Sequence, residues 1–406
     1  MKSKARMERG LGDFICLMLL FPVYLLSKII PKNKKLYIFG SSQGLQFADN
    51  SKYLFLYVSN NIKTVKPVFI TRKKEIAANL NGNSLAAIYL FSLKGFWTVL
   101  RAGTAFISYS DMDISPILTG GTKIIQLWHG TPLKKIGYDT NHNTDDFKGR
   151  LKQSLKTFVY SLFPYLITSK GFDKIIVTSD FVRSSYRSAF GRNDDDIIVV
   201  GNPRNDGLLD NKILDKSVFP EINSLNQLRE KSKTIIAWLP TYRLPAPVNI
   251  VNLMENYGFD IREFNKLLEK NSASLIIKPH VVDKEILQDQ IKGSDRIIAY
   301  EESDPYPLLK YSDILITDYS SVYFDFLLLN RPIIFAPFDF EDYIQTNGSF
   351  YYDYDEVTPG PKCSNWNEVA QELNKIIASL EDPKTDLYAE ERRKLNDQFN
   401  YNHRQI

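Results

Sequence analysis

Short strand-like runs that alternate with helical stretches constrain the fold of this chain more than any other feature. Their β-branched and aromatic side chains favour strands, and the helical stretches between them return the chain to the same edge of a sheet. Strands connected in this way pair in parallel. The runs form two series, separated by a polar stretch at about residues 206–232. The sequence therefore predicts an α/β protein with two doubly wound domains.

The first series comprises KLYIFG (35–40), VKPVFIT (65–71), TAFISYS (104–110), TKIIQLW (122–128), DKIIVTS (173–179) and DIIVVGNP (196–203). The second comprises TIIAWLPTYR (234–243), ASLIIKPH (273–280), DRIIAY (295–300), DILITDYS (313–320) and RPIIFAP (331–337). A chain of 406 residues also exceeds what one hydrophobic core usually supports. We therefore expect a membrane-associating segment at 1–34, an N-terminal domain at 35–210, a C-terminal domain at 211–385 and a terminal helix or tail at 386–406.

The carboxyl ends of these strands are where a ligand is expected. Ligands of open α/β sheets bind at that edge, and small-molecule sites favour the interface between domains. We therefore expect the functional site in a cleft between the two domains, lined by the polar residues that follow each strand.

Composition and missing motifs exclude several classes of protein. Lysine and arginine exceed aspartate and glutamate by 51 − 47 = 4, which suits anionic partners but gives no reason to expect nucleic acid. Only two cysteines occur, so neither a disulfide framework nor a cysteine zinc site is expected. The chain has no G-x-x-x-x-G-K-[ST] or G-x-G-x-x-G motif, which removes the usual support for an ATPase or a dehydrogenase. The tripeptide DMD (111–113) is like the acidic pair that holds a metal in sugar transferases of another fold, but it is short enough to arise by chance. We expect no metal and no cofactor.

The N-terminus carries an apolar run, FICLMLLFPVYLL (14–26), with lysine and arginine on both sides. The run is shorter than the roughly 20 residues of a spanning helix, and Pro22 would interrupt its hydrogen bonding. We expect it to lie in the interface of the cytoplasmic leaflet, where its basic flanks attract anionic lipids. A buried core helix, a signal sequence and a true span are the alternatives. A second basic amphipathic stretch (147–166) is expected to be a helix that packs on the core or contacts the membrane.

Two of the four histidines follow strand-like runs, one in each predicted domain. His129 follows TKIIQLW, and His280 ends ASLIIKPH. An imidazole titrates near neutral pH and can take a proton from an attacking hydroxyl group. A structural histidine that is hydrogen-bonded within a turn is the alternative for His129. His142 and His403 lie in polar surroundings, and we exclude both from the site.

The residues after His129 predict a helix that begins there. Gly130 lets a ligand approach the backbone, Thr131 would be the cap, and Pro132 would lie in the first turn. The N–H groups of such a helix end would face a phosphate, with Lys134 and Lys135 nearby.

Other strands are followed by residues that suit a polyphosphate. LITDYSS (315–321) ends with Asp318, Ser320 and Ser321 ahead of an apolar helix, where serine hydroxyl groups can cap the helix or bind phosphate oxygens. Arg204 in GNPRND and Arg243 in PTYR carry guanidinium groups that suit bidentate phosphate contacts. DYSS alone is equally typical of a structural cap, so the prediction of a polyphosphate site rests on the combination.

Together these motifs resemble the CDP-glycerol glycerophosphotransferase family, which includes teichoic-acid primases and polymerases and related capsule enzymes. The resemblance covers most of the chain and leaves out about the first 30 residues and the final helix. The motifs that carry it are FADNSKYLFLYV (47–58), WHGTPLKKIG (128–137), TSDFVRSSYRSAFG (178–191), GNPRND (201–206), LPTYR (239–243), IIKPH (276–280), ITDYSSVYFDFLLLNRPIIF (316–335) and FYYDYDEVTPGP (350–361).

The resemblance implies a GT-B-like fold in which two Rossmann-like domains face a central cleft. It implies transfer of glycerol phosphate, or a similar polyol phosphate, from CDP-glycerol or a related CDP-polyol, with release of CMP. The implied acceptor is a hydroxyl group of a lipid-linked glycan or polymer in teichoic-acid or capsule synthesis, at the cytoplasmic face of the cell membrane.

The resemblance also assigns roles to residues. It makes His129 the general base, and His280 the partner of the donor phosphates and of the leaving CMP. The donor-binding residues that it implies are Gly130, Thr131, Arg204, Thr241, Arg243, Lys278, Asp318, Ser320 and Ser321, of which Arg204 and Asp318 could instead brace the site.

Two other functions stay open at this point. A GT-B glycosyltransferase that uses a sugar nucleotide would share the architecture but would release a nucleoside diphosphate. A non-catalytic, membrane-bound scaffold that binds a nucleotide would release no nucleotide.

Overall fold

The protein is described from a computed structural model, which describes residues 20–140, 171–210, 213, 218–241, 243, 249–279, 283–380 and 385–400. The chain forms two compact units. The first comprises the described residues of Met1–His129, His142–Ile176 and Asp195–Ile198, and the second those of Gly130–Asn141, Val177–Asp194 and Val199–Ile406. The chain therefore passes from one unit to the other between His129 and Gly130. The expected domain limits stay a prediction.

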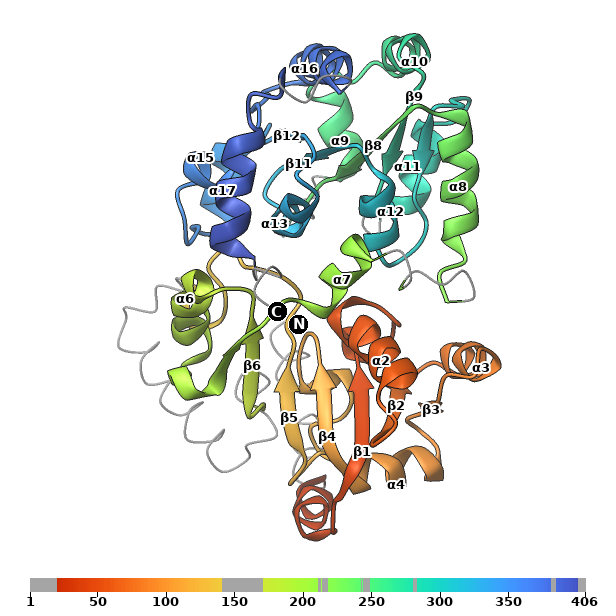
Figure 1. The fold of residues 1–406 in the computed structure, drawn as a ribbon, viewed down its shortest axis with the longest axis vertical. Helices are drawn as coiled ribbons and strands as arrows, with labels where there is room; N and C mark the ends of the chain where they lie inside the picture. The colour runs from red at the N-terminus through yellow and green to blue at the C-terminus, as the bar shows by residue number, and fades with distance from the viewer. Residues whose placement is uncertain are drawn as a thin grey trace, which may run out of the picture. The chain divides into compact units, whose positions relative to one another are not determined.

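The seven-stranded sheet has the order β3-β2-β1-β4-β5-β6-β7. Adjacent strands from β3 to β6 pair in parallel, and the arrows of β1, β4, β5 and β6 point the same way in Figure 1. After β1, the chain adds β2 and β3 on one side of that strand and then β4 to β7 on its other side. This change of direction is the reversal of a doubly wound sheet. The strands are β1 (Asn33–Gly40), β2 (Lys66–Thr71), β3 (Ala87–Tyr89), β4 (Ala102–Ile107), β5 (Lys123–Gln126), β6 (Lys174–Val177) and β7 (Ile197–Val199).

Helices connect these strands. A helix over residues 20–29 precedes β1, and the others in this part of the chain are α2 (Asp49–Asn61), α3 (Lys74–Gly82), α4 (Leu93–Arg101) and α6 (Asp180–Phe190), with 3₁₀ turns η1 (Ser42–Gly44), η2 (Asp111–Asp113), η3 (Gly137–Asp139) and η5 (Asp194–Asp196). In the part of the chain that the structure describes, no helix is long and apolar enough to cross a membrane.

The five-stranded sheet has the order β10-β9-β8-β11-β12, and all its adjacent strands pair in parallel. Its central strands are buried on both faces and are apolar almost throughout, as parallel sheets covered by helices require. Their reversal point lies between β8 and β11, so a ligand crevice is expected at the carboxyl ends of these two strands. The strands are β8 (Thr234–Leu239), β9 (Ala273–Ile277), β10 (Ile297–Ala299), β11 (Ile314–Thr317) and β12 (Ile333–Phe335).

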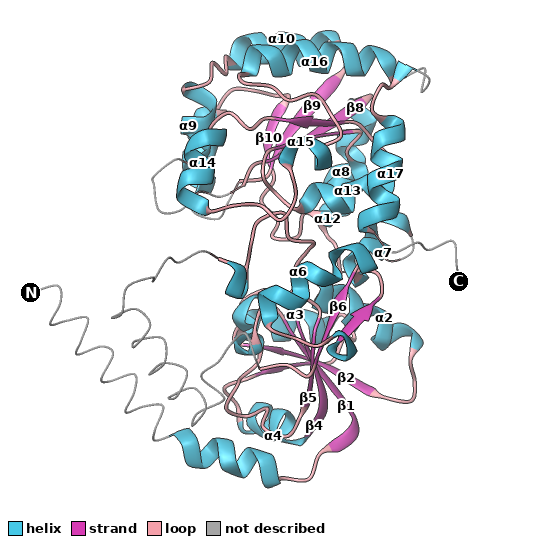
Figure 2. Cartoon of the chain, turned by 90° about the vertical axis from the view of Figure 1, so that its left-hand side faces the viewer, coloured by secondary structure: helices cyan, strands magenta, loops and turns pink. Residues whose placement is uncertain are grey.

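One face of this second sheet packs on a core around Trp238 and Trp366, whose rings meet edge to face at 4.6 Å. Helices α10 and α16 lie side by side at one end of the unit (Figure 2). The helices of the second unit, besides α6, are α7 (Pro203–Leu209), α8 (Glu221–Lys231), α9 (Ile250–Glu255), α10 (Ile261–Lys270), α11 (Lys284–Gln290), α12 (Tyr306–Tyr311), α13 (Val322–Phe326), α14 (Phe340–Asn347), α15 (Tyr354–Val357), α16 (Trp366–Ser379) and α17 (Ala389–Phe399), with a 3₁₀ turn η7 (Leu327–Leu329).

The prediction of two Rossmann-like parallel sheets is confirmed, because every predicted run contains a strand. The edge strand β3 was missed, because its three residues give too short a pattern to distinguish. Several predictions lie outside the described residues: residues 1–19 of the apolar N-terminal segment, the amphipathic stretch at 147–166, and three of the four histidines, including His280.

Candidate functional site

His129 lies in the first unit, three residues after the end of β5. Its Nδ1 atom is 3.2 Å from the carbonyl oxygen of Ser108. A carbonyl oxygen only accepts hydrogen bonds, so Nδ1 carries the proton of the neutral ring and Nε2 carries the lone pair. The ring stacks on Tyr109 at 4.3 Å and packs against Trp128 at 4.2 Å. This geometry holds the imidazole in the tautomer that a general base at Nε2 needs.

A buried carboxylate supports the loop that holds His129. Asp113 accepts hydrogen bonds from the backbone N–H groups of Ser108 at 2.8 Å and Tyr109 at 2.7 Å. It also accepts one from the N–H of Gln43 at 2.7 Å, and it is only 1% exposed. Burial raises the pKa of Asp113 to about 6, although these N–H groups favour its ionised form. Asp113 therefore fixes the backbone on which the His129 ring rests.

A second support acts on the strand side of His129. The side-chain amide of Asn50, at the start of α2, donates to the carbonyl oxygens of Leu127 at 3.1 Å and Trp128 at 2.9 Å. Trp128 has φ +56°, a left-handed conformation that is uncommon for a residue other than glycine. The two hydrogen bonds from Asn50 hold this turn in place. Sequence reasoning missed both Asn50 and Asp113 as supports, although each belongs to a stretch that it had singled out.

Gly130, Arg204 and Ser321 lie together in the second unit. Gly130 has φ +130°, and a Cβ atom there would be 2.7 Å from Arg204 Nη2 and 3.2 Å from Ser321 Oγ. Arg204 on α7 pairs through Nη2 with Asp325 Oδ2 at 2.6 Å, and the two side chains are 6% and 0% exposed. Tyr306 donates a hydrogen bond to the same carboxylate oxygen and stacks under the guanidinium at 4.9 Å. The buried pair with Asp325 neutralises and orients Arg204.

Arg243 and Asp318 form a second charged cluster, at the reversal point between β8 and β11. Arg243 pairs with Asp318 at 2.6 Å and with Asp339 through two N–H groups, at 2.8 and 2.9 Å. Burial opposes the guanidinium charge, yet the two carboxylates raise the pKa of Arg243 above its ordinary value. Thr241 donates two hydrogen bonds to Asp318, from its backbone N–H at 2.9 Å and its hydroxyl group at 2.6 Å. Direct contact of Arg243 with a donor phosphate stays a prediction, because the structure shows its guanidinium held by two carboxylates.

The predicted helix after His129 is wrong. Residues 127–136 form no helix, and the next turn is η3 at Gly137–Asp139. Instead, Leu133 and Lys135 exchange backbone hydrogen bonds with Tyr351 and Ser349. Thr131 caps no helix and bonds to the hydroxyl group of Thr178 at 3.1 Å. Threonine and proline are typical of a helix start, but pairing with a distant segment of the chain overrides that local preference.

Lys134 reaches the second cluster by the same pairing, through its β-bridge to Phe350. Its amine donates to the hydroxyl group of Tyr343 at 2.9 Å. Burial lowers the pKa of Lys134, while Asp318 opposes the shift and Arg243 adds to it. Two cations, Lys134 and Arg243, therefore face two carboxylates, Asp318 and Asp339, in one largely buried network.

Ser320 and Ser321 are half-buried at the start of α13. Ser321 is the N-cap residue but makes no side-chain cap hydrogen bond, and Ser320 Oγ accepts from the N–H of Val322 at 3.5 Å. Lys278 follows β9, and burial, together with Lys284, lowers its pKa to about 8. All the predicted donor residues that the structure describes belong to the second unit, and His129 belongs to the first. Among the described residues, no group of three or more histidine, cysteine, aspartate or glutamate side chains is arranged to hold a metal ion.

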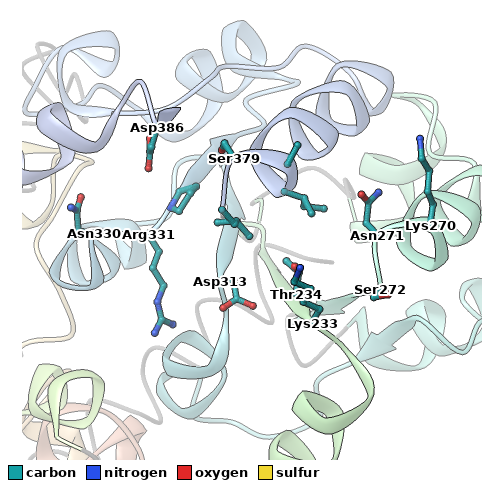
Figure 3. A pocket seen from close by; sticks show the side chains of 14 residues that line it. Lys233, Thr234, Lys270, Asn271, Ser272, Asp313, Asn330, Arg331, Ser379 and Asp386 are labelled. Carbon is teal, nitrogen blue, oxygen red and sulfur yellow. The ribbon is translucent and has the colours of Figure 1, made fainter. Parts of the chain in front are cut away.

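A cavity of about 670 Å³ lies at the edge of the second sheet where its strands begin, opposite the carboxyl ends that hold the predicted site residues (Figure 3). Its lining includes Thr234, Ser272 and Asp313, which begin or immediately precede β8, β9 and β11. The lining lysine and arginine side chains lie where helices end, and cations there complement the negative end of the helix dipole. None of the predicted site residues lines this cavity, so we assign it no part in the reaction.

Comparison with known proteins identifies the family. A family model described as CDP-Glycerol:Poly(glycerophosphate) glycerophosphotransferase matches residues 23–404. This chain belongs to that family. The teichoic acid poly(glycerol phosphate) polymerase of Bacillus spizizenii strain W23 is 31% identical to it over 369 residues, which are 87% of this chain and 86% of the relative. The teichoic acid glycerol-phosphate transferase of Staphylococcus aureus strain NCTC 8325 is 29% identical over 366 residues, 87% of each protein.

The fold of this glycerophosphotransferase is also that of a solved relative. The wall teichoic acid polymerase TagF, in a structure soaked with CDPG, matches with a TM-score of 0.73 at 22% identity, over 97% of this chain and 92% of that one. The family resemblance inferred from the motifs is therefore confirmed, and the chain is a glycerophosphotransferase with the same fold as TagF.

Proposed function

We propose that this enzyme transfers a glycerol phosphate unit, or a similar polyol phosphate, from its CDP-alcohol to a hydroxyl group of a lipid-linked teichoic-acid or capsule-type polymer, and releases CMP. The donor class is supported by family membership, since the matching family is described by its CDP-glycerol donor. The acceptor class is supported by the names of the two relatives, which act in teichoic acid synthesis. The observation that carries the mechanism is the hydrogen bond from His129 Nδ1 to Ser108, because it leaves the basic nitrogen at Nε2.

In the proposed reaction, the acceptor oxygen attacks the phosphorus that bears the glycerol, and His129 takes the proton of the acceptor hydroxyl at Nε2. The bond between that phosphorus and the bridging oxygen of CDP breaks, and CMP leaves with this oxygen. Fixed donors must balance the negative charge that spreads over the transferring group. The candidates are Gly130 N–H, Ser320, Ser321, Lys134 and Lys278, with Arg204 and Arg243 holding the site together through their carboxylate partners.

The proposal needs both units to contribute to one donor molecule. His129 would come from the first unit and His280, which follows β9, from the second. It therefore includes the GT-B-like arrangement in which two Rossmann-like domains face a central cleft. The proposal also places the enzyme at the cytoplasmic face of the membrane, attached peripherally through the basic-flanked apolar segment at 14–26.

Product analysis tests the reaction. The protein is incubated with CDP-glycerol or CDP-ribitol and candidate acceptors, and CMP and product mass are followed together. We expect CMP and a mass increase of one or more polyol phosphate units. Release of a nucleoside diphosphate from a sugar nucleotide would contradict the proposal in favour of a glycosyltransferase, and no release from any donor would favour a scaffold.

Replacing His129 with alanine tests its role as base. General-base catalysis typically contributes about 10²- to 10⁴-fold, so kcat should fall by that order. Binding of CDP-glycerol, measured by calorimetry, should change little, because the ring acts on the acceptor. A variant with preserved turnover would remove His129 from the mechanism.

A further inference from the structure

Helix α4 turns its apolar side chains toward solvent. Leu93 is 90% exposed, Trp97 59% and Phe96 40%, and their spacing places them on one face of the helix. The opposite face is buried through Gly95 and Val99, where Gly95 lets the helix lie directly against the carbonyl groups of residues 89 and 90. A surface helix of a soluble domain normally buries its apolar face. The exposed apolar face of α4 is therefore a candidate surface for binding a partner.

The helix over residues 20–29 shows the same reversal. Ile29 is 77% exposed, Leu26 50% and Leu25 47%, while Ser27 and Tyr24 face the protein. Eight of the 21 large hydrophobic side chains that are exposed in the described part of the chain lie in residues 20–29 and 91–97. Exposed apolar side chains are common one by one, but a cluster of this kind marks an interaction surface.

Both helices lie at the edge of the first sheet where its strands begin (Figures 1 and 2). The amine of Lys32, just after the first helix, donates to the carbonyl oxygen of Leu100 near the end of α4 at 2.8 Å. Asn33 at the start of β1 pairs with Ala102 at the start of β4. The two helices therefore belong to one edge of the unit.

This edge is basic, and the segments that carry the two helices have no carboxylate. Asp173, which precedes β6 at the same edge, accepts a hydrogen bond from the backbone N–H of Ile124 at 2.6 Å. Residues 14–48 and 76–110 contain no aspartate or glutamate. The cations in or beside the two helices are Lys28, Lys32, Lys34, Lys35, Lys94 and Arg101. Lys66 and Lys123 begin β2 and β5 at the same edge, because parallel strands start on one side of the sheet. Burial lowers the pKa of Lys32 to about 8, and the nearby charge of Arg101 adds to the shift.

We propose that α4 is a second membrane-docking element, which seats this edge of the first unit on the anionic surface of a lipid bilayer together with the helix over residues 20–29. Tryptophan, phenylalanine and leucine beside lysine and arginine are the side chains that interfacial helices insert at the headgroup level. Arg101 lies over the Trp97 ring at 5.9 Å, so one cation would reach lipid phosphates beside the inserted ring. A soluble protein partner would need to be strongly acidic to match the same charge, and an anionic bilayer matches it without further assumption.

The proposed orientation sets the height of the reaction above the bilayer, a consequence that rests on the proposed function. Six residues separate Lys123 at the basic edge from His129, and the chain is extended over Lys123–Gln126 but turns at Trp128, where φ is +56°. At about 3.3 Å per residue, the strand spans roughly 10 Å and the whole segment at most about 20 Å, so the reacting hydroxyl group of the acceptor would stand roughly 10–20 Å from that edge. A lipid-linked acceptor with several sugar or polyol phosphate units between the lipid and the reacting hydroxyl group is long enough to span this distance, whereas a bare lipid phosphate is not.

Vesicle binding tests the surface with matched variants of the full chain. The Leu93→Ser/Trp97→Ser double variant is compared with Leu387→Ser, which removes a side chain of similar exposure, 89%, from the second unit. On vesicles of phosphatidylglycerol and phosphatidylcholine, we expect the partition coefficient to fall about 10-fold or more for the double variant and to stay unchanged for Leu387→Ser. Salt or pure phosphatidylcholine should weaken binding of the unchanged protein, since each cation near the surface contributes about fivefold. Equal binding of the double variant and the unchanged protein, or equal binding to neutral and anionic vesicles, would overturn the proposal.

Fluorescence tests insertion of α4 itself, whatever the N-terminal segment contributes. Brominated lipids should quench the unchanged protein, and Trp97→Phe should lose that quenching. Trp238 and Trp366 are buried, and the half-buried Trp128 follows the carboxyl end of β5, away from the edge where the strands begin. Quenching that persists in Trp97→Phe, or a dimer in light scattering that the double variant abolishes, would overturn the proposal. CMP release with a water-soluble acceptor should be the same in the double variant and the unchanged protein. This readout separates the docking surface from the proposed reaction, which would fail in both proteins if the function were wrong.

Discussion

Replacing Gly130 with alanine measures how firmly the structure holds Arg204. The new Cβ would lie 2.7 Å from Arg204 Nη2, whereas ordinary contacts begin at 3.4 Å, so the guanidinium must retreat by about 3.4 − 2.7 = 0.7 Å. A flexible arginine on the surface would move aside at little cost. Arg204 is instead buried, paired with Asp325 at 2.6 Å and stacked on Tyr306. A retreat of this size away from Asp325 would lengthen the contact to about 2.6 + 0.7 = 3.3 Å, at the long end of hydrogen-bonding lengths, and would weaken the ion pair.

The expected cost combines two effects. An alanine at φ +130° costs on the order of 1–3 kcal/mol of backbone strain. Breaking one side of a buried ion pair costs about 3–5 kcal/mol, and a stretched pair costs part of that. We therefore expect Gly130→Ala to lower the free energy of unfolding by about 3–5 kcal/mol. Gly258→Ala is the control, since φ is +79° there and a Cβ atom would meet nothing within 4 Å. It should cost only the strain, about 1–2 kcal/mol.

Urea unfolding followed by tryptophan fluorescence measures the difference. The buried Trp238 and Trp366 report on the second unit, which contains Gly130 and Gly258, and Trp97 and Trp128 report on the first unit, so the variants are compared by the transition of the second unit. CMP release should fall further in Gly130→Ala than in Gly258→Ala, since the residue next to Gly130 is His129. Equal losses of stability in the two variants would refute the reasoning, because Arg204 would then be free to move.

Two more perturbations probe the groups around the site. Asp113→Asn should lower kcat about 10-fold or more with little change in donor affinity, since its carboxylate supports the Ser108 and Tyr109 backbone. The kcat of the control Asp111→Asn, on the same turn, should stay close to that of the unchanged protein. Similar kcat values in the two variants would contradict a positioning role for Asp113. Lys278 has a pKa of about 8 in the folded protein against 10.5 in the unfolded chain, so the unfolded chain binds the proton more tightly between these values. The free energy of unfolding should therefore rise from pH 8 to 10.5, by about 2.5 × 1.36 ≈ 3 kcal/mol relative to Lys278→Met in parallel urea titrations, and a flat difference would show that the amine is solvated.

The architecture could be read from the sequence because its signals are local. A run such as TIIAWL in β8 is buried on both faces, and burial on both faces requires an almost continuous apolar run. The same pattern located His129 beyond β5 and Asp318 beyond β11, since residues after parallel strands share one edge. The family resemblance rested on motifs of this kind, at strand ends.

The supports of the site could not be read in this way. Arg204 and Asp325 are 121 residues apart, and Arg243 and Asp339 are 96 apart. No spacing rule links such pairs, so the sequence could not show that carboxylates hold the two arginines. The helix expected after His129 failed for the same reason, because Leu133 and Lys135 pair with a segment more than 200 residues away.

By itself, the sequence determined two parallel sheets, the order of their strand-like runs and the edge at which polar residues collect, because burial imposes a periodicity on each element that its own residues must satisfy. Only the tertiary structure decided which carboxylate neutralises each buried arginine, which tautomer His129 adopts and which way the apolar face of α4 points. These depend on charge neutralisation, hydrogen bonding and packing between residues that meet only once the chain has folded.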